Sequence, residues 1–187
     1  MTEAQIVLLE NQDPPRGNFD LKHLQALHKF LFGNIYDWAG EIRTAGFISK
    51  GKSVFCHSDF IVPYAQSLFS RMHREDFRKM TREQCAKRMA FYLSEVNALH
   101  PFREGNGRTT RLFFEIFAKT NGWDLCFAAI PHDEFVEAMI ESMSGFYGQT
   151  RDHYRKSPYY QTITIYSDNK HTKGAHVIHS YHTYFGF

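Results

Sequence analysis

A run of twelve residues, 100–111, constrains this chain more than any other part of its sequence. It contains a base that titrates near neutrality, a carboxylate, a glycine-flanked loop and two arginines. Pro101 disfavours the α conformation of the residue before it, so a helix on its N-terminal side must end near Leu99. Residues 108–120 contain neither proline nor glycine and have apolar residues at helical spacing, until Asn121 and a glycine end the pattern. The run is therefore predicted to be a loop that joins two helices.

Other segments also show apolar residues at helical spacing. One has Asp20 as its N-cap and Gly33 at its end. Another leads into the loop and has Thr81 or a neighbour as its cap, and a third follows Pro131, whose fixed φ suits a helix start. The predicted helices are residues 21–32, 61–69, 85–99, 108–120 and 132–144.

A β-hairpin is predicted between the first two of these helices. Residues 42–49 and 54–57 flank a short glycine-containing link, as hairpin strands do. Residues 162–166 have the composition of a strand, but the rest of the segment 157–187 has no clear period, and its structure is left open. We therefore expect a mainly α protein, a helical bundle with a small hairpin, as one domain over residues 1–156 with a C-terminal tail.

Composition narrows the class of protein. A chain of 187 residues can form one domain with a hydrophobic core, and 43% hydrophobic residues exclude wholesale disorder. A net charge of +2 is too small to predict nucleic-acid or membrane binding, and no stretch approaches the roughly 20 apolar residues that span a bilayer. Cys56, Cys85 and Cys126 have the spacing of neither a disulfide framework nor a metal site. We expect a cytoplasmic protein, with delivery into another cell left open.

The glycines and arginines of the run suit a polyphosphate. Gly105, Asn106 and Gly107 permit a tight turn, and the first N–H groups of the helix that follows point back into that turn, where they can bind anions. Arg108 and Arg111 lie three residues apart on this helix and can clamp one polyanion with planar donors. These five residues are predicted to bind a nucleotide.

The remaining residues of the run suit proton transfer beside that nucleotide. Glu104 would repel phosphates directly, and a Mg²⁺ ion between carboxylate and phosphates removes the conflict. His100 has an ordinary pKa of about 6.5 and is the natural general base. Phe102 is apolar between polar neighbours and is predicted to anchor the loop in the core. A glycine turn alone would be only a loop, and Arg111 could pair with Glu115 on a solvated helix face, but the joint pattern favours the site.

The run resembles the signature of the Fic family, HxFx(D/E)GNGRxxR, at every fixed position. The resemblance extends over roughly residues 11–147, including Tyr36-Asp37-Trp38-Ala39-Gly40. It implies a helical fold with one hairpin, and transfer of AMP from ATP to a Ser, Thr or Tyr hydroxyl of a target protein. It also implies the roles assigned above: His100 as base, Glu104 as Mg²⁺ ligand, residues 105–107 around the phosphates, and Arg108 with Arg111 on the β and γ phosphates.

The predicted hairpin, residues 42–57, is similar to the flap with which the family aligns its target by strand-like pairing. On this flap Lys50, Lys52 and Phe55 are candidates for docking the target; a plain surface hairpin is the alternative. No nucleic acid is required for this activity.

Regulation is the point where the chain departs from part of the family. Many Fic proteins are inhibited by a glutamate of an (S/T)xxxE(G/N) helix that pairs with the second arginine of the signature, here Arg111. Glu10 precedes Asn11, but Ile6 stands where Ser or Thr belongs, and no glutamate follows Glu141. The chain thus looks similar to bacterial toxin-type Fic proteins, whose inhibitory glutamate comes from a separate small antitoxin.

Two other functions stay open at this point. One is transfer of another phosphate-bearing group, or phosphorylation, on the same fold. The other is a non-catalytic nucleotide-binding adaptor. The presence of both His100 and Glu104 favours AMP transfer.

Overall fold

The computed structural model describes residues 12–51, 53–125, 127, 133, 137, 139–140 and 165–167. Within them, four α-helices have both ends defined: α2 (Leu21–Phe32), α3 (Ser58–His73), α4 (Arg82–Leu99) and α5 (Asn106–Thr120). A short 3-10 helix, η1 (Phe77–Lys79), joins α3 to α4. The strands form two small antiparallel pairs, β1 (Ser49–Lys50) with β2 (Ser53–Val54), and β3 (Trp123–Leu125) with β4 (Ile165–Ser167).

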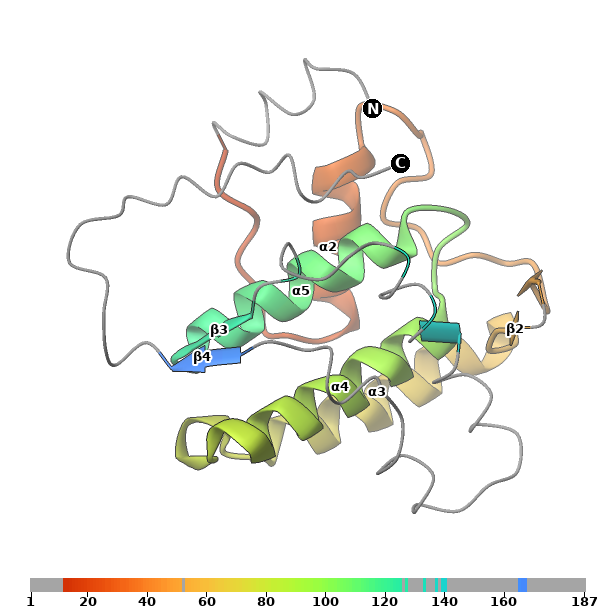
Figure 1. The fold of residues 1–187 in the computed structure, drawn as a ribbon. Coiled ribbons are helices and arrows are strands. Elements are labelled where there is room, and N and C mark those ends of the chain that lie inside the picture. The colour runs from red at the N-terminus through yellow and green to blue at the C-terminus, as the bar shows by residue number, and fades with distance from the viewer. Residues whose placement is uncertain are drawn as a thin grey trace.

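The helices enclose one hydrophobic core. Helices α3 and α4 lie side by side, and α5 crosses between them and α2 (Figure 1). The main buried side chains of the core come from all four helices: Leu24, Leu27, Ile61, Leu68, Met89, Leu93, Phe113 and Phe114. The expectation of a mainly α protein with a small hairpin is confirmed.

The predicted helix starts have the expected caps. Asp20 accepts a hydrogen bond from the N–H of His23 at 2.8 Å, and Thr81 forms a reciprocal capping box with Gln84. Helix α3 extends beyond the predicted residues 61–69 in both directions, because the spacing of apolar residues does not mark the polar residues at its two ends. Helix α5 begins at residue 106 instead of 108, since the turn before it is completed within a single glycine.

The predicted hairpin is present, but its strands are much shorter than residues 42–49 and 54–57. The side chain of Arg43 explains the difference. Its guanidinium donates hydrogen bonds to the carbonyl oxygens of Ala45, Gly46 and Cys56, so a side chain binds main-chain groups that a longer strand ladder would use, although Gly46 also accepts from the N–H of Ser58 at 3.0 Å. The N–H of Cys56 donates to the carbonyl of Ala98 in α4 instead of pairing across the hairpin.

The second sheet was only half predicted. Strand β4 overlaps the expected strand 162–166, but its partner β3 follows α5 directly and was not predicted. The indole N–H of Trp123 donates to the carbonyl of Phe77 at 2.8 Å, which fixes β3 to η1. The predicted helix 132–144 lies largely outside the described residues, as do Glu10 and Cys126. Of the helices that the structure describes, none has the length and apolar character needed to cross a membrane.

Candidate active site

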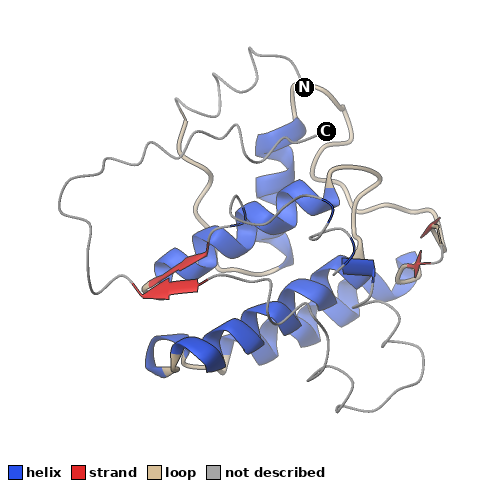
Figure 2. Ribbon diagram, viewed as in Figure 1, coloured by secondary structure: helices blue, strands red, loops and turns tan. Residues whose placement is uncertain are grey.

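The run 100–111 lies where α4 ends and α5 begins, joined by a short loop (Figure 2). The hairpin of β1 and β2 lies beside this loop on the same side of the molecule (Figure 1). The structure thus brings together all the predicted residues of the run, with Lys50 and Phe55 from the hairpin. Lys52 is outside the described residues.

His100 is the C-cap of α4 and has the left-handed backbone conformation, with φ 45° and ψ 60°. That conformation is uncommon for a residue with a side chain. It turns the chain abruptly from the helix into the loop, and the N–H of His100 still donates to the carbonyl of Val96 at 3.2 Å. The predicted helix end at Pro101 is confirmed.

The imidazole of His100 is stacked on the ring of Phe55, with 3.8 Å between the ring centroids. Its pKa is lowered to about 4, mainly by burial and also by the positive charges of Arg43 and Lys50, while the Asn97 carbonyl and the charge of Glu104 act in the opposite direction. Within the part of the chain that the structure describes, its Nδ1 atom is buried without a hydrogen-bond partner. At neutral pH the ring is therefore uncharged and able to accept a proton.

The loop is closed by one side chain. The amide of Asn106 accepts a hydrogen bond from the N–H of Phe102 at 2.9 Å and donates to the carbonyl of Phe102 at 2.8 Å. Phe102 is 1% exposed and stacks on His28. The oxygen and one of the two N–H donors of the Asn106 side chain are thus occupied within the loop.

Gly105 and Gly107 differ in why they are glycine. Gly105 has φ 79°, and a Cβ there would lie 2.5 Å from the ring of Phe32, so both conformation and space require glycine. Gly107 has no left-handed φ, and a Cβ there would meet nothing within 4 Å. Nothing within the described chain accounts for Gly107, whereas a ligand that approaches the backbone closely would.

The start of α5 has no side-chain cap. The first intrahelical hydrogen bond runs from the N–H of Thr109 to the carbonyl of Gly105 at 3.1 Å. The N–H groups of residues 106–108 precede it and have no intrahelical partner, which is the usual basis of anion binding at a helix start. The predicted anion cradle therefore has the required backbone geometry.

Glu104 directs an exposed carboxylate into solvent beside this helix start. Its side chain is 63% exposed, and Oε1 accepts from the N–H of Gly105 at 2.9 Å and lies 3.8 Å from Nη2 of Arg108. An exposed carboxylate of this kind fits Mg²⁺, which binds through one or two carboxylates, water and phosphate oxygens. No group of three or more potential metal ligands occurs among the described residues, so such an ion would depend on phosphate and water for its other ligands.

The two arginines of the run occupy different surroundings. The guanidinium of Arg108 lies 4.6 Å from the ring centroid of Phe32, which aligns it beside the helix start. Arg111 is half-buried, and burial lowers its pKa. Burial also raises the pKa of the neighbouring Glu115 to about 8, against the opposing effect of Arg111. Glu115 is thus a weaker counter-charge for Arg111 at neutral pH than an ionised carboxylate would be, and the solvated helix face considered as an alternative is not what the structure has.

Comparison with known proteins agrees with this geometry. The profile described as the Fic/DOC family matches residues 18–118. The chain belongs to the Fic/DOC family. It is 38% identical over 133 residues to the Probable protein adenylyltransferase y4lH of Sinorhizobium fredii, covering 70% of this chain and 69% of that protein. It is 33% identical over 158 residues to the Probable protein adenylyltransferase Fic of Salmonella typhimurium, covering 84% and 77%. Among solved structures it is similar to the Bartonella tribocorum effector BepC with bound AMPPNP, at a TM-score of 0.71 and 22% identity, covering 88% and 83%.

Two residues that hold this Fic/DOC site together were not found from the sequence. His28 of α2 is fully buried; its Nδ1 accepts from the N–H of Gly40 at 2.8 Å, so its Nε2 carries the proton and donates to the carbonyl of Glu104 at 2.9 Å. Arg43 donates to the carbonyl of His100 at 2.7 Å. For His28 the sequence signal was a polar residue within an apolar helical face, which does not reveal its partner; Arg43 lies outside the helices and had no such signal.

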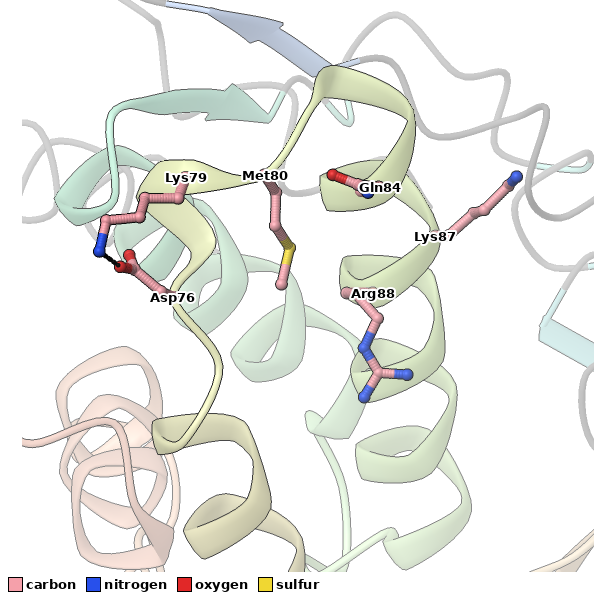
Figure 3. A pocket seen from close by; sticks show the side chains of 6 residues that line it. All are labelled: Asp76, Lys79, Met80, Gln84, Lys87 and Arg88. Atoms are coloured by element: carbon pink, nitrogen blue, oxygen red, sulfur yellow. Dashed lines mark ion pairs between the residues drawn. The ribbon is translucent and has the colours of Figure 1, made fainter.

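A separate hollow, drawn in Figure 3, lies at the other end of α4 and is lined by Asp76, Lys79, Met80, Gln84, Lys87 and Arg88. An 18-residue helix is about 27 Å long, so this hollow is remote from His100. Its cations are paired with carboxylates: Lys79 with Asp76 at 2.8 Å, Lys87 with Glu83, and Arg88 with Glu75. The chemistry of the Fic/DOC site is therefore not found there.

Proposed function

We propose that this protein transfers AMP from ATP to a Ser, Thr or Tyr hydroxyl of a target protein. The chain is a protein adenylyltransferase by its family and by four curated relatives of that name at 33–39% identity. One observation carries the detailed mechanism: the uncharged imidazole of His100 and the carboxylate of Glu104 lie in one short loop, residues 100–105, that leads into the uncapped start of α5.

The chemistry is a single displacement at the α-phosphorus. The imidazole of His100 takes the proton of the target hydroxyl, whose oxygen forms a bond to the α-phosphorus as the bond to the β-phosphate oxygen breaks and pyrophosphate leaves. The loop of residues 105–107 surrounds the phosphates, which are held by the unpaired backbone N–H groups at the start of α5 and by the guanidinium groups of Arg108 and Arg111. Glu104 would hold Mg²⁺, which when bound neutralises charge that develops on the phosphate oxygens.

The hairpin is proposed to dock the target. Its strands have only two residues each and therefore leave backbone groups on both edges for pairing with an extended segment. Phe55 stacks on the imidazole of His100, and the positive charge of Lys50 contributes to lowering the pKa of His100. A segment bound to this hairpin would therefore lie close to the base. Lys52 is the third proposed docking residue.

Control by a separate antitoxin is proposed on the grounds of sequence. A glutamate of that partner would pair with Arg111 and displace the γ-phosphate. Without the partner, the chain would be active. Its place of action would be the cytoplasm of its own or of a recipient cell. If Glu10→Gly strongly raised the activity of the isolated chain, inhibition would come from within the chain and this part of the proposal would be wrong.

The position of the transferred label tests the reaction. The protein is incubated with a cell lysate, Mg²⁺ and ATP labelled at either the α or the γ phosphate, in parallel with His100→Ala. Label from the α position that His100→Ala abolishes supports AMP transfer. Label from the γ position alone would mean phosphorylation, and absence of both would favour a nucleotide-binding adaptor.

A further inference from the structure

Arg43 lies buried beside the catalytic base without a carboxylate partner among the described residues. Arg43 is 2% exposed, and its guanidinium donates hydrogen bonds to main-chain carbonyl oxygens. Nε donates to His100 at 2.7 Å, Nη1 to Ala45 at 2.7 Å and to Gly46 at 2.8 Å, and Nη2 to Cys56. Burial of an arginine is costly unless its donors are satisfied, and here carbonyl groups satisfy them.

These carbonyls come from three separate segments. Residues 45–46 and Cys56 are the two sides of the hairpin base, and His100 is the end of α4. The backbone N–H of Arg43 also donates to the carbonyl of Pro101 at 2.9 Å. The planar fork of an arginine can bind several carbonyls in fixed directions at once, which the single ammonium group of a lysine cannot reproduce.

The base needs such support for two reasons. His100 has a left-handed backbone conformation, which persists in a protein only where the surroundings hold it. Its imidazole is also stacked on Phe55 of the hairpin, and the N–H of Cys56 donates to the carbonyl of Ala98 at 2.9 Å. The position of the imidazole therefore depends on where the hairpin base is held.

We propose that Arg43 is a positioning residue for AMP transfer: it fixes the position of the hairpin base relative to the main chain of His100. A target segment lying along the hairpin then brings its hydroxyl to the imidazole at reaction distance. The expected effect on catalysis rests on the proposed function. The structural coupling of the hairpin to the loop through Arg43 does not depend on it. The hydrogen bonds of Arg43 given above do not involve the start of α5, where the phosphates are proposed to bind, so ATP binding should not depend on Arg43.

The first test separates the maximal rate from ATP binding. Arg43→Met removes all side-chain donors, and Arg43→Lys keeps the buried charge but not the fork. Initial rates of label transfer from α-labelled ATP to lysate protein are measured against ATP concentration. A displacement of about 1 Å at the reacting atoms can lower a rate about 100-fold, so we expect a loss of about this size in Arg43→Met and about tenfold in Arg43→Lys. The ATP concentration at half-maximal rate should stay within about twofold of wild type.

The second test needs no activity. Hydrogen–deuterium exchange followed by mass spectrometry compares peptides that cover residues 42–57 and 97–105 with peptides from α2 and α3. Both Arg43 variants should exchange faster in the first two regions only. Arg88→Met is the matched control, because Arg88 is a structural arginine that binds Glu75 at the other end of α4, and it should leave those two regions unchanged.

Each result decides the inference. A uniform rise in exchange, the same pattern in Arg88→Met, or a raised half-saturating ATP concentration at an unchanged maximal rate would overturn it. If Arg43→Met does not fold, Arg43→Lys decides by the same measurements. If wild-type protein transfers no label, the proposed function fails by itself, and the exchange experiment still decides whether Arg43 couples the hairpin to the loop.

Discussion

Replacing Gly105, the N-cap of α5, and Gly107, in its first turn, by alanine should have opposite effects on stability. In Gly105→Ala the new Cβ lies 2.5 Å from the ring of Phe32, which is fully buried, and the residue must keep φ 79°. The left-handed conformation costs about 1–2 kcal/mol for a residue with a Cβ. Overpacking against an immobile ring adds about 1–3 kcal/mol. The sum, about 2–5 kcal/mol, is a large part of the 5–15 kcal/mol that typically stabilises a domain.

Gly107→Ala should have the reverse effect on the fold. Its Cβ meets nothing within 4 Å and its backbone is helical, so the higher helix propensity of alanine should stabilise the protein by up to about 1 kcal/mol. The same methyl group lies where a phosphate would approach the start of α5. We therefore expect ATP binding and AMP transfer to fall about tenfold or more, as a small displacement of a reacting group allows.

The assay pairs thermal unfolding, followed by circular dichroism, with calorimetric titration of ATP and Mg²⁺. For a chain of this size, 1 kcal/mol corresponds to about 2–4 °C in Tm. Gly105→Ala should lower Tm by about 4–20 °C, and Gly107→Ala should raise it by up to about 4 °C while weakening ATP binding. A Gly107→Ala protein that binds ATP as the wild type does would refute a close approach of phosphate to this backbone. A Gly105→Ala protein with unchanged Tm would refute the steric account.

Three further perturbations follow from the site. Burial lowers the pKa of His100 in the folded state to about 4, below its ordinary value of 6.5. The unfolded chain therefore binds a proton more readily between these two values, so the free energy of unfolding should be highest above about pH 6.5 and fall by about 3 kcal/mol as the pH is lowered to about 4. Urea unfolding at several pH values should show this loss, and His100→Gln should reduce it; an unchanged slope would contradict the assignment. Asn106→Ala removes both hydrogen bonds to Phe102 and should cost about 1–3 kcal/mol in urea unfolding. Asn106→Asp keeps the acceptor but places a buried carboxylate oxygen against the carbonyl of Phe102, so it should cost at least as much, and a variant as stable as wild type would contradict this role of Asn106. His28→Phe keeps an aromatic ring against Phe102 but removes the hydrogen bond to the carbonyl of Glu104. The variant should lose AMP-transfer rate at a temperature at which it is still fully folded. If its rate falls only where thermal unfolding begins, His28 has no positioning role.

The elements that sequence could predict are those with local signals. Asp20, Thr81 and Pro101 act on residues within four positions of themselves, and α2 and α4 begin or end where these residues indicate. Strand β3 has no such signal, because its pairing partner is β4, some forty residues later in the chain. The hairpin strands were overestimated since a glycine-containing link between two segments does not reveal that carbonyl groups near Arg43 are bound by its side chain.

The same distinction holds within the site. The base, the exposed carboxylate, the glycines and the arginines lie in one continuous run and could be predicted together. The residues that hold them could not, because His28 is 76 positions from Glu104 and Arg43 is 57 positions from His100. Both also bind main-chain carbonyls, which every residue has, so no complementary side chain in the sequence indicates the contact.

That choice of partners has a consequence for how the site works. His28, Arg43 and Asn106 bind backbone atoms of the loop from the buried side, whereas the exposed carboxylate of Glu104 on its outer side contacts only the N–H of Gly105 and the side chain of Arg108 within the described residues. The loop can therefore be rigid before any nucleotide arrives, and little binding free energy is lost in ordering it. It also follows that substitutions from the buried side should lower the transfer rate through geometry, whereas substitutions of Glu104 should lower it through loss of the bound ion. Raising the Mg²⁺ concentration should restore part of the activity of Glu104→Gln and none of the activity of Arg43→Met.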